Sequence, residues 1–342
     1  MQIENFSLTF GKDFPILAAM KTRLTFYLMM LVLLFAGCNS KTSKKGAIVL
    51  SHSDIITISG AHALSPMVSV WIEEFRKTHP YVKFKLNPNG SGGGLKEILA
   101  GKVDMAMISE KLPKDTDTAL WVVPVARLGV VPIISGKNPY LDQIRKKGMT
   151  KEILNGLFSG KNEKTWGDLY GRPGKDPVKL YRRGDTSGAA TVFAKYLSLS
   201  RDQIQGTPVS GEAQLIEQVK NDPLALSYCN FIYAIDPAKK QFLEEVVVLP
   251  IDFWGKGSFH GKDNIFDSFD HLQRAMWLGK YPSALTRDLS LVTKGKPRTR
   301  EMVDFLYWVV TDGQKFVPDN GYTELHSSDV QSIANEMKAM IP

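Results

Sequence analysis

The sequence predicts an α/β protein with mainly parallel sheets, and two observations support this. Between residues 55 and 108, β-rich runs alternate with segments whose apolar residues recur at helical spacing. The same alternation returns after residue 150. Strands joined through helices lie parallel, with right-handed crossovers. Roughly 300 residues follow the N-terminal leader, which is long enough for two such domains.

The first unit begins with a β-rich run at residues 55–58. A helix should follow, with Ser65 as its N-cap and Pro66 as its first residue. Its apolar residues keep the i, i+3, i+4, i+7 spacing of one buried face, and they are Leu64, Met67, Val68, Trp71, Ile72 and Phe75. A strand, a short helix and a strand are then expected at residues 82–86, 95–100 and 103–108.

The second unit repeats this order. A helix capped by Thr150 is expected over residues 150–158, a strand over 178–182 and a helix over 188–199. Two of the loops before helices contain Ser-Gly, at 91–92 and 187–188, and a third such junction spans Gly60–Pro66. In open α/β sheets these loops lie at the carboxyl ends of strands, where ligands bind. The three helix N-termini are therefore expected to converge on one ligand.

The segment NPNGSGGG, residues 87–94, has two interpretations. Three consecutive glycines lose much backbone entropy on folding, so they indicate a backbone that approaches something closely, such as an anion at a helix N-terminus. The alternative is a loose surface turn. The segment is not a P-loop, because no Gly-Lys-Ser/Thr follows it.

Arg183 ends a predicted buried strand, where a guanidinium is costly unless it is paired. Asp185 could orient it while an oxyanion takes its other donors. The alternative is an Arg–Asp surface pair of little energetic value. Arg182 should point to the opposite face and be solvated.

The string GDTSG around Ser187 is similar to a serine protease motif. Helices and parallel strands contradict an all-β protease barrel, and a triad is defined by geometry. No Cys/His group has zinc spacing, so neither a metal nor a cofactor is expected.

The N-terminal residues 1–37 have the character of a signal peptide. Lys21 and Arg23 precede a short apolar run that ends in FAGC. Cys38 after this run resembles a bacterial lipobox cysteine, which implies cleavage before Cys38 and its lipidation. Met20 is a better start than Met1, so residues 1–19 are a possible extension. An uncleaved anchor is the alternative, and residues 38–54 are expected to be the lipidated cysteine and its tether.

The chain carries a net charge of +8, which suits an anionic partner. The charge is spread along the chain, and no basic run with interleaved aromatic residues indicates nucleic acid. If Cys38 is acylated, Cys229 is the remaining thiol, so no intramolecular disulfide is expected.

Several ordered motifs resemble the phosphate-binding proteins of ABC importers, within the type II periplasmic binding proteins. They are ITISGAHALSPMVSVWIEEF, NGSGGGLKEILAGKVDMAMIS, LNGLFSGKNEKTWGDL, YRRGDTSGAATVFAKYL and DFLYWVVTDGQKFVPDNGYTEL. The resemblance implies a two-lobed fold, with lobe I at 55–130 plus 285–342 and lobe II at 131–284. Each lobe should have a mainly parallel sheet flanked by helices. The segments 125–135 and 285–294 should be the two crossing strands.

The resemblance also implies a ligand site, carried over position by position. The implied anion ligands are His62, Ala63, Ser91, Ser109, Arg183, Ser187, Gly188 and Ala189, and the supporting residues are Gly92, Glu110 and Asp185. Arg183 is expected to supply the only full positive charge. His62, in place of the family's Thr or Ser, either couples binding to pH or merely fills the loop. Ala189 replaces a threonine hydroxyl.

The implied function is capture of inorganic phosphate between the lobes and delivery to an ABC permease in the membrane. We expect a monomeric, non-enzymatic, lipid-anchored protein outside the cytoplasm, in the periplasm or at the cell surface. Ser109 stands where some members have an Asp that accepts the phosphate proton, so another oxyanion or a small carboxylate remains an alternative. A serine hydrolase acting through Ser187 is a second alternative.

Overall fold

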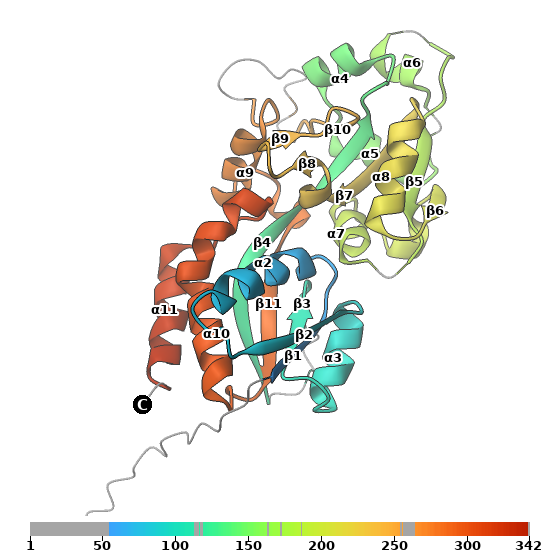
Figure 1. The fold of residues 1–342 in the computed structure, drawn as a ribbon. Helices are drawn as coiled ribbons and strands as arrows, with labels where there is room; N and C mark the ends of the chain where they lie inside the picture. Colours follow the sequence, from blue (N-terminus) through green and yellow to red (C-terminus); the bar gives the residue numbers. More distant parts are fainter. Residues whose placement is uncertain are drawn as a thin grey trace, which may run out of the picture. The chain divides into compact units, whose positions relative to one another are not determined.

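The computed structural model describes residues 55–112, 116, 119–162, 164–171, 173–185, 187–253, 255 and 264–340. The expected leader, Cys38 and the tether lie outside these residues. Within the described part, one nine-stranded mixed sheet has the order β2-β1-β3-β11-β4-β7-β5-β6, and β10 pairs with β4. The predicted α/β class is confirmed, and helices lie along the sheet (Figure 1).

The strands of this sheet are β1 Ile55–Gly60, β2 Lys83–Pro88, β3 Met105–Ile108, β4 Leu120–Ser135, β5 Lys179–Arg183, β6 Thr207–Val209, β7 Ala225–Asn230, β10 Val246–Val248 and β11 Thr286–Lys294. A small hairpin joins β8 Ile235–Asp236 to β9 Gln241–Phe242. The α-helices are α2 Ser65–Arg76, α3 Ser91–Leu99, α4 Leu141–Lys147, α5 Lys151–Phe158, α6 Trp166–Tyr170, α7 Gly188–Tyr196, α8 Glu212–Asn221, α9 Phe269–Trp277, α10 Arg300–Val310 and α11 Ser327–Lys338.

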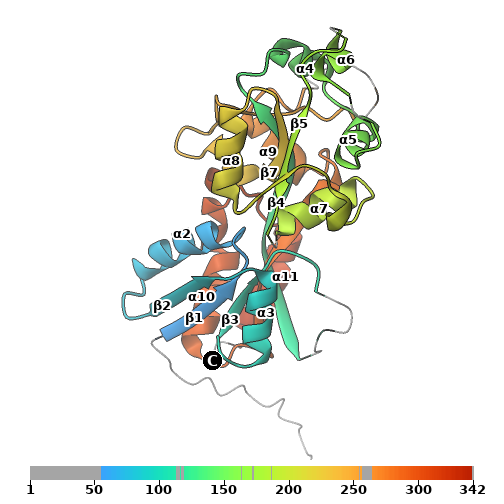
Figure 2. The same cartoon turned by 90° about the vertical axis from the view of Figure 1, so that its right-hand side faces the viewer.

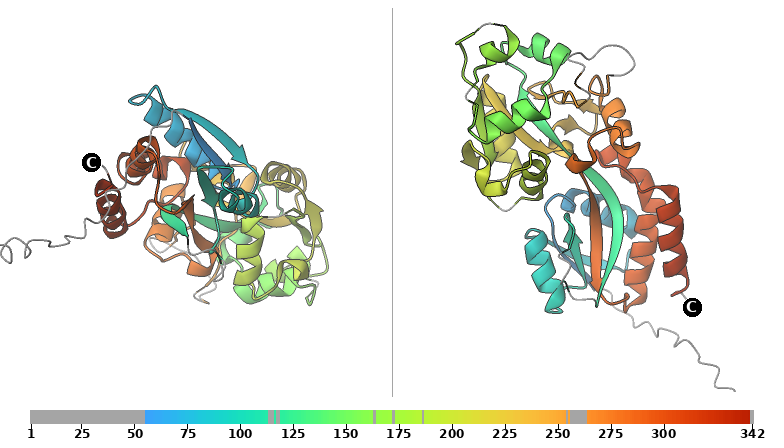
Figure 3. Two further views of the ribbon diagram at one scale, coloured as in Figure 1. Left: turned by 90° about the horizontal axis from the view of Figure 1, so that it is seen from below. Right: turned by 180° about the vertical axis from the view of Figure 1, so that it is seen from behind.

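Strand β4 connects two groups of parallel strands. Its first part pairs antiparallel with β11, from Leu120 opposite Lys294 to Gly129 opposite Thr286. Its last part pairs antiparallel with β7 and β10. Strands β1, β2 and β3 are mutually parallel beyond β11, and β5, β6 and β7 are mutually parallel on the other side. Figures 1 and 3 show β4 and β11 side by side between these groups.

We call the β1–β3 group with α2, α3, α10 and α11 lobe I, and the β5–β7 group with α4–α9 lobe II (Figure 2). The two crossing strands predicted from the sequence are β4 and β11, although β4 is longer than expected because it also spans residues 120–124. The residue bounds of the lobes stay a prediction.

Each lobe has a buried aromatic group that fixes helices to the sheet. In lobe I, Phe75 of α2 meets Phe305 of α10 edge to face, with ring centroids 5.2 Å apart. In lobe II, Phe193 of α7 stacks on Tyr228 of β7 at 4.3 Å, and Phe158 of α5 meets Phe193 at 5.0 Å. Of these rings, Phe75 lies on the apolar helix face that the sequence spacing predicted.

The start of α3 differs from the prediction. The helix begins at Ser91, so all three glycines lie inside its first turns and not in a loop before a helix at 95–100. A Cβ on Gly94 would lie 2.7 Å from the Gly60 Cα and 2.9 Å from the Ser59 carbonyl oxygen. Gly94 is therefore required because α3 packs directly on the backbone at the end of β1. The loose-turn interpretation is wrong.

Two caps test the predicted helix starts. Thr150 caps α5 as expected, since its Oγ1 accepts from the Ile153 N–H. Ser65 was expected to cap α2, but Leu64 holds the N-cap position without a side-chain cap. Ser65 and Pro66 both belong to the first turn, so this prediction is wrong by one residue.

Candidate functional site

Three chain junctions meet around one pocket between the lobes. Lobe I contributes Ala61–Ala63 after β1 and Gly90–Gly92 at the start of α3, and lobe II contributes Ser187 and Gly188 at the start of α7. The cavity measures about 70 Å³, far below the roughly 300–1,000 Å³ of pockets for drug-sized ligands. The predicted convergence of the junctions is present, and the space suits a small ion.

The lobe I wall is held by short backbone contacts. Ser91 Oγ accepts from the Ser109 N–H at 3.1 Å and lies 3.1 Å from Ser109 Oγ. The N–H groups of Asn89 and Gly90 both donate to the Gly60 carbonyl, at 3.0 and 2.8 Å. Gly90 has φ 84°, a conformation that favours glycine. These contacts bring the ends of β1 and β3 against the first turn of α3.

The loop after β1 is fixed from the C-terminal part of the chain. The buried Tyr322 hydroxyl donates to the Ala63 carbonyl at 2.9 Å. His62 in the same loop is exposed and lines the pocket. A histidine in this place can contact both solvent and a bound anion.

The lobe II wall is the N-terminus of α7. Ser187 is its N-cap, and its Oγ accepts from the Ala190 N–H at 3.4 Å. Free N–H groups of a first helical turn attract anions. A Cβ on Gly188 would lie 2.9 Å from Ser109 Oγ of the opposite lobe. Glycine at 188 therefore lets the two lobes approach each other at the pocket.

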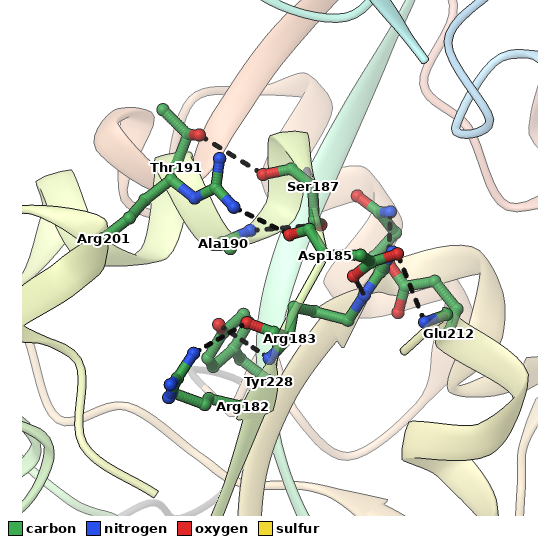
Figure 4. Close-up of polar contacts among 11 residues, drawn as sticks. Arg182, Arg183, Asp185, Ser187, Ala190, Thr191, Arg201, Glu212 and Tyr228 are labelled. Carbon is green, nitrogen blue, oxygen red and sulfur yellow. Dashed lines mark hydrogen bonds and ion pairs between the residues drawn. The ribbon is translucent and has the colours of Figure 1, made fainter. Parts of the chain in front are cut away.

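Arg183, at the end of β5, has two carboxylate partners. Its Nε and Nη2 donate to the two Asp185 oxygens at 2.7 Å each, and its Nη1 lies 3.0 Å from Glu212 Oε1. Figure 4 shows its side chain extended toward these carboxylates, whereas Arg182 points the other way. Burial alone would raise the pKa of Asp185, but the hydrogen bond and charge of Arg183 outweigh it and lower that pKa. Arg183 is thus buried and held by two hydrogen bonds to the partly exposed Asp185, unlike the partners of a fully exposed surface ion pair.

Glu212 and Asn230 extend this network. Glu212, at the start of α8, accepts from Asn230 Nδ2 at 2.6 Å through Oε1, while its Oε2 is buried without a hydrogen-bond partner among the described residues. Burial raises the pKa of Glu212 to about 7, even though the charge of Arg183 opposes the shift. The Oδ1 of Asn230 accepts from Arg287 Nη2 at 2.6 Å. Two arginines are therefore connected through Glu212 and Asn230.

Arg183 is not the only full positive charge here, so that expectation is wrong. Arg201 and Arg287 also line the pocket. Arg201 Nη2 donates to the Asp185 carbonyl at 2.7 Å, and Arg287 is buried on β11. A sequence pattern could have identified Arg287 as buried. Strand alternation places it on the same face as Leu289 of an apolar crossing strand.

Most of the residues expected in the site come together. The pocket lining contains His62, Ala63, Ser91, Gly92, Ser109, Glu110, Arg183, Ser187 and Gly188. Asp185 is outside the lining and holds Arg183. Ala189 is buried and is also outside the lining. The sequence interpretation missed Thr191, Arg201, Glu212, Asn230, Tyr233 and Arg287, which line the pocket as well.

The described part of the chain contains no group of three or more His, Cys, Asp or Glu residues suited to a metal ion. None of its helices is both long and apolar enough to span a bilayer.

Comparison with known proteins places the chain in a family. The model of the PBP superfamily domain matches residues 42–313. The phosphate-binding protein PstS of Bacillus subtilis is 26% identical over 245 residues, which cover 68% of this chain and 76% of that protein. PstS of Staphylococcus aureus is 20% identical over 289 residues, covering 82% of each.

Solved structures share the fold. A Clostridium perfringens protein, described as a candidate phosphate ABC transporter substrate-binding protein with bound phosphate, superposes with a TM-score of 0.64. It is 20% identical, and the match covers 80% of this chain and 100% of that one. An ABC-type phosphate transport receptor from Vibrio cholerae gives a TM-score of 0.59 at 17% identity, covering 79% and 100%. With its two-lobed α/β architecture and a match over residues 42–313, the chain belongs to the PBP superfamily.

Proposed function

We propose that this protein captures inorganic phosphate in the interlobe pocket and delivers it to an ABC permease. The observation that carries the proposal is the convergence of two helix N-termini, from α3 and α7, with the paired Arg183 on one small cavity. Helix N-termini and a preoriented guanidinium both favour an oxyanion. Relatives named as phosphate-binding proteins support the same ligand.

The proposed ligands are His62, Ala63, Ser91, Ser109, Arg183, Ser187, Gly188 and Ala189, with Gly92, Glu110 and Asp185 in support. Ser91 and the first N–H groups of α3 would contact the anion from lobe I, and Ser187 with the start of α7 from lobe II. The small cavity favours an inorganic oxyanion over a larger carboxylate.

We further propose that the protein is a monomeric binding protein without catalytic activity. Ser187 Oγ is engaged as a helix cap, and among the described residues no hydrogen bond links it to a histidine. It would act outside the cytoplasm, anchored through a lipidated Cys38. Mass spectrometry of the mature N-terminus tests this anchor, and an unmodified Cys38 would contradict it.

Calorimetric titration tests the ligand. Phosphate should bind with 1:1 stoichiometry, and sulfate should displace little of it. The reason is that hydrogen phosphate carries a proton, for which the buried Glu212 and Ser109 oxygens can act as hydrogen-bond acceptors, whereas sulfate has none. Equal affinity for both anions would show a general oxyanion site. Ester hydrolysis that disappears in Ser187→Ala would support the hydrolase instead.

A further inference from the structure

Arg287 is a buried cation without a carboxylate partner in the described part of the chain. It lies on the crossing strand β11 and is 9% exposed. Its Nη2 donates to the amide oxygen of Asn230 at 2.6 Å. Its Nε and Nη1 are buried and have no hydrogen-bond partner among the described residues. Of the donors of a guanidinium, most are therefore available.

The two buried arginines of the pocket differ in charge balance. Arg183 contacts two carboxylates, Asp185 and Glu212, so its charge is already compensated. Arg287 has only the neutral amide of Asn230. An unpaired buried charge is costly unless an opposite charge joins it. Burial lowers the pKa of Arg287 to about 10, although the charges of Glu212 and Glu110 oppose the shift.

The guanidinium also lies where the anion is expected. A Cβ on Gly188 would be 3.5 Å from Arg287 Nη2, so Arg287 adjoins the first residue of α7. Both this helix N-terminus and Arg287 line the same cavity. Two positive ends side by side, with no direct anionic partner for Arg287 in the described part, make this wall of the pocket a place for an anion.

We propose that Arg287 is a second guanidinium ligand of the captured oxyanion, contributed by the strand that crosses between the lobes. The inference rests on the proposed function and adds a buried residue whose charge no carboxylate among the described residues compensates. Arg183, held by its carboxylates, orients the anion through its remaining N–H groups, and Arg287 neutralises it.

The test compares Arg287→Met and Arg287→Lys with the wild type and with Arg127→Met. Arg127 is a matched control, because it lies on the neighbouring strand β4 and forms a half-exposed pair with Asp288 at 2.9 Å outside the pocket. Each protein is titrated with inorganic phosphate by calorimetry, and its melting temperature is measured without ligand.

Arg287→Met should raise the phosphate Kd at least about tenfold, the scale of one lost hydrogen bond to a charged group. Its ligand-free melting temperature should not fall, because an unpaired buried charge is removed. Arg287→Lys should recover part of the affinity, since it keeps the charge without the planar fork. Arg127→Met should bind as the wild type does.

The outcomes separate the two proposals. If the wild type binds phosphate and Arg287→Met binds it with equal affinity, the proposed role of Arg287 is wrong and the proposed function stands. A wild type that binds no oxyanion overturns the proposed function, and this inference with it. If Arg287→Met fails to fold, Arg287→Lys decides: wild-type affinity there would contradict ligation by the guanidinium, and a loss larger than that of Arg127→Met would support it.

Discussion

Arg183 is oriented by groups of the protein itself. Asp185 accepts hydrogen bonds from its Nε and Nη2, and Glu212 forms an ion pair with its Nη1. Its side chain is 6% exposed, so the guanidinium has little freedom to lose on binding. Such preorganisation raises affinity by lowering the entropy cost of the contact.

Replacing Arg183 by Ala should weaken phosphate binding roughly 30-fold or more, because truncating one member of a buried charge pair costs about 2–5 kcal/mol. The variant should also melt earlier, since Asp185 and Glu212 lose their cation. Arg182→Ala is the neighbouring control and should bind normally, because its side chain points away (Figure 4). Calorimetry with thermal melts measures both. If a folded Arg183→Ala protein binds normally and Arg182→Ala loses binding, then Arg182, and not Arg183, faces the pocket.

The secondary-structure elements were largely predictable from local spacing. The helical face with Trp71 and Phe75 and the Thr150 cap follow from short-range patterns, and the helix after Ser187 begins at Gly188 as expected. The start of α3 did not follow from such a pattern, because three glycines have poor helix propensity. Tertiary packing decides there: Gly94 lies against the β1 backbone, and no local pattern contains that contact.

This explanation of α3 makes a paired prediction. Gly94→Ala should lower the free energy of unfolding by about 1–3 kcal/mol, because its Cβ would overlap backbone atoms of Ser59 and Gly60 that cannot rotate away. Gly92→Ala, in the same helix, should be neutral or stabilising by at most about 0.5–1 kcal/mol, since no heavy atom lies within 4 Å of its Cβ. Urea unfolding of both variants gives the comparison. Equal losses would indicate a general helix effect in place of close packing.

From the residues themselves, the site was predictable only at the strand–helix junctions that the sequence pattern had identified. Ser91, Arg183 and Ser187 each stand at such a junction, and topology brings junctions together. Glu212, Asn230 and Arg287 come from a helix start, a strand end and a crossing strand far apart in sequence. Their roles follow from mutual contacts, at 2.6 Å from Asn230 to each of the other two. Such pairings need the tertiary structure.

Through Glu212, these contacts make the stability of the folded protein depend on pH. Glu212 faces Arg183 from β5, Asn230 from β7 and Arg287 from β11. Burial raises its pKa from 4.5 to about 7, so between these values the folded state binds more protons than the unfolded state. The contribution of Glu212 to stability is therefore present at low pH and is lost as the pH rises through this window.

Glu212→Gln should remove this dependence. Relative to the variant, the ligand-free wild type should lose roughly 3 kcal/mol of unfolding free energy between pH 4.5 and about 7. Glu217→Gln is the matched control, because Glu217 is an exposed glutamate on the same helix, and it should follow the wild-type curve. Denaturant titrations at several pH values, in buffers free of phosphate, measure the three curves. If the wild type instead gains stability over Glu212→Gln as the pH rises, the attraction of Arg183 outweighs burial, and Glu212 is a carboxylate throughout this range. Arg183 would then face two ionised carboxylates, Asp185 and Glu212, which would leave Arg287 as the more important cation for anion binding.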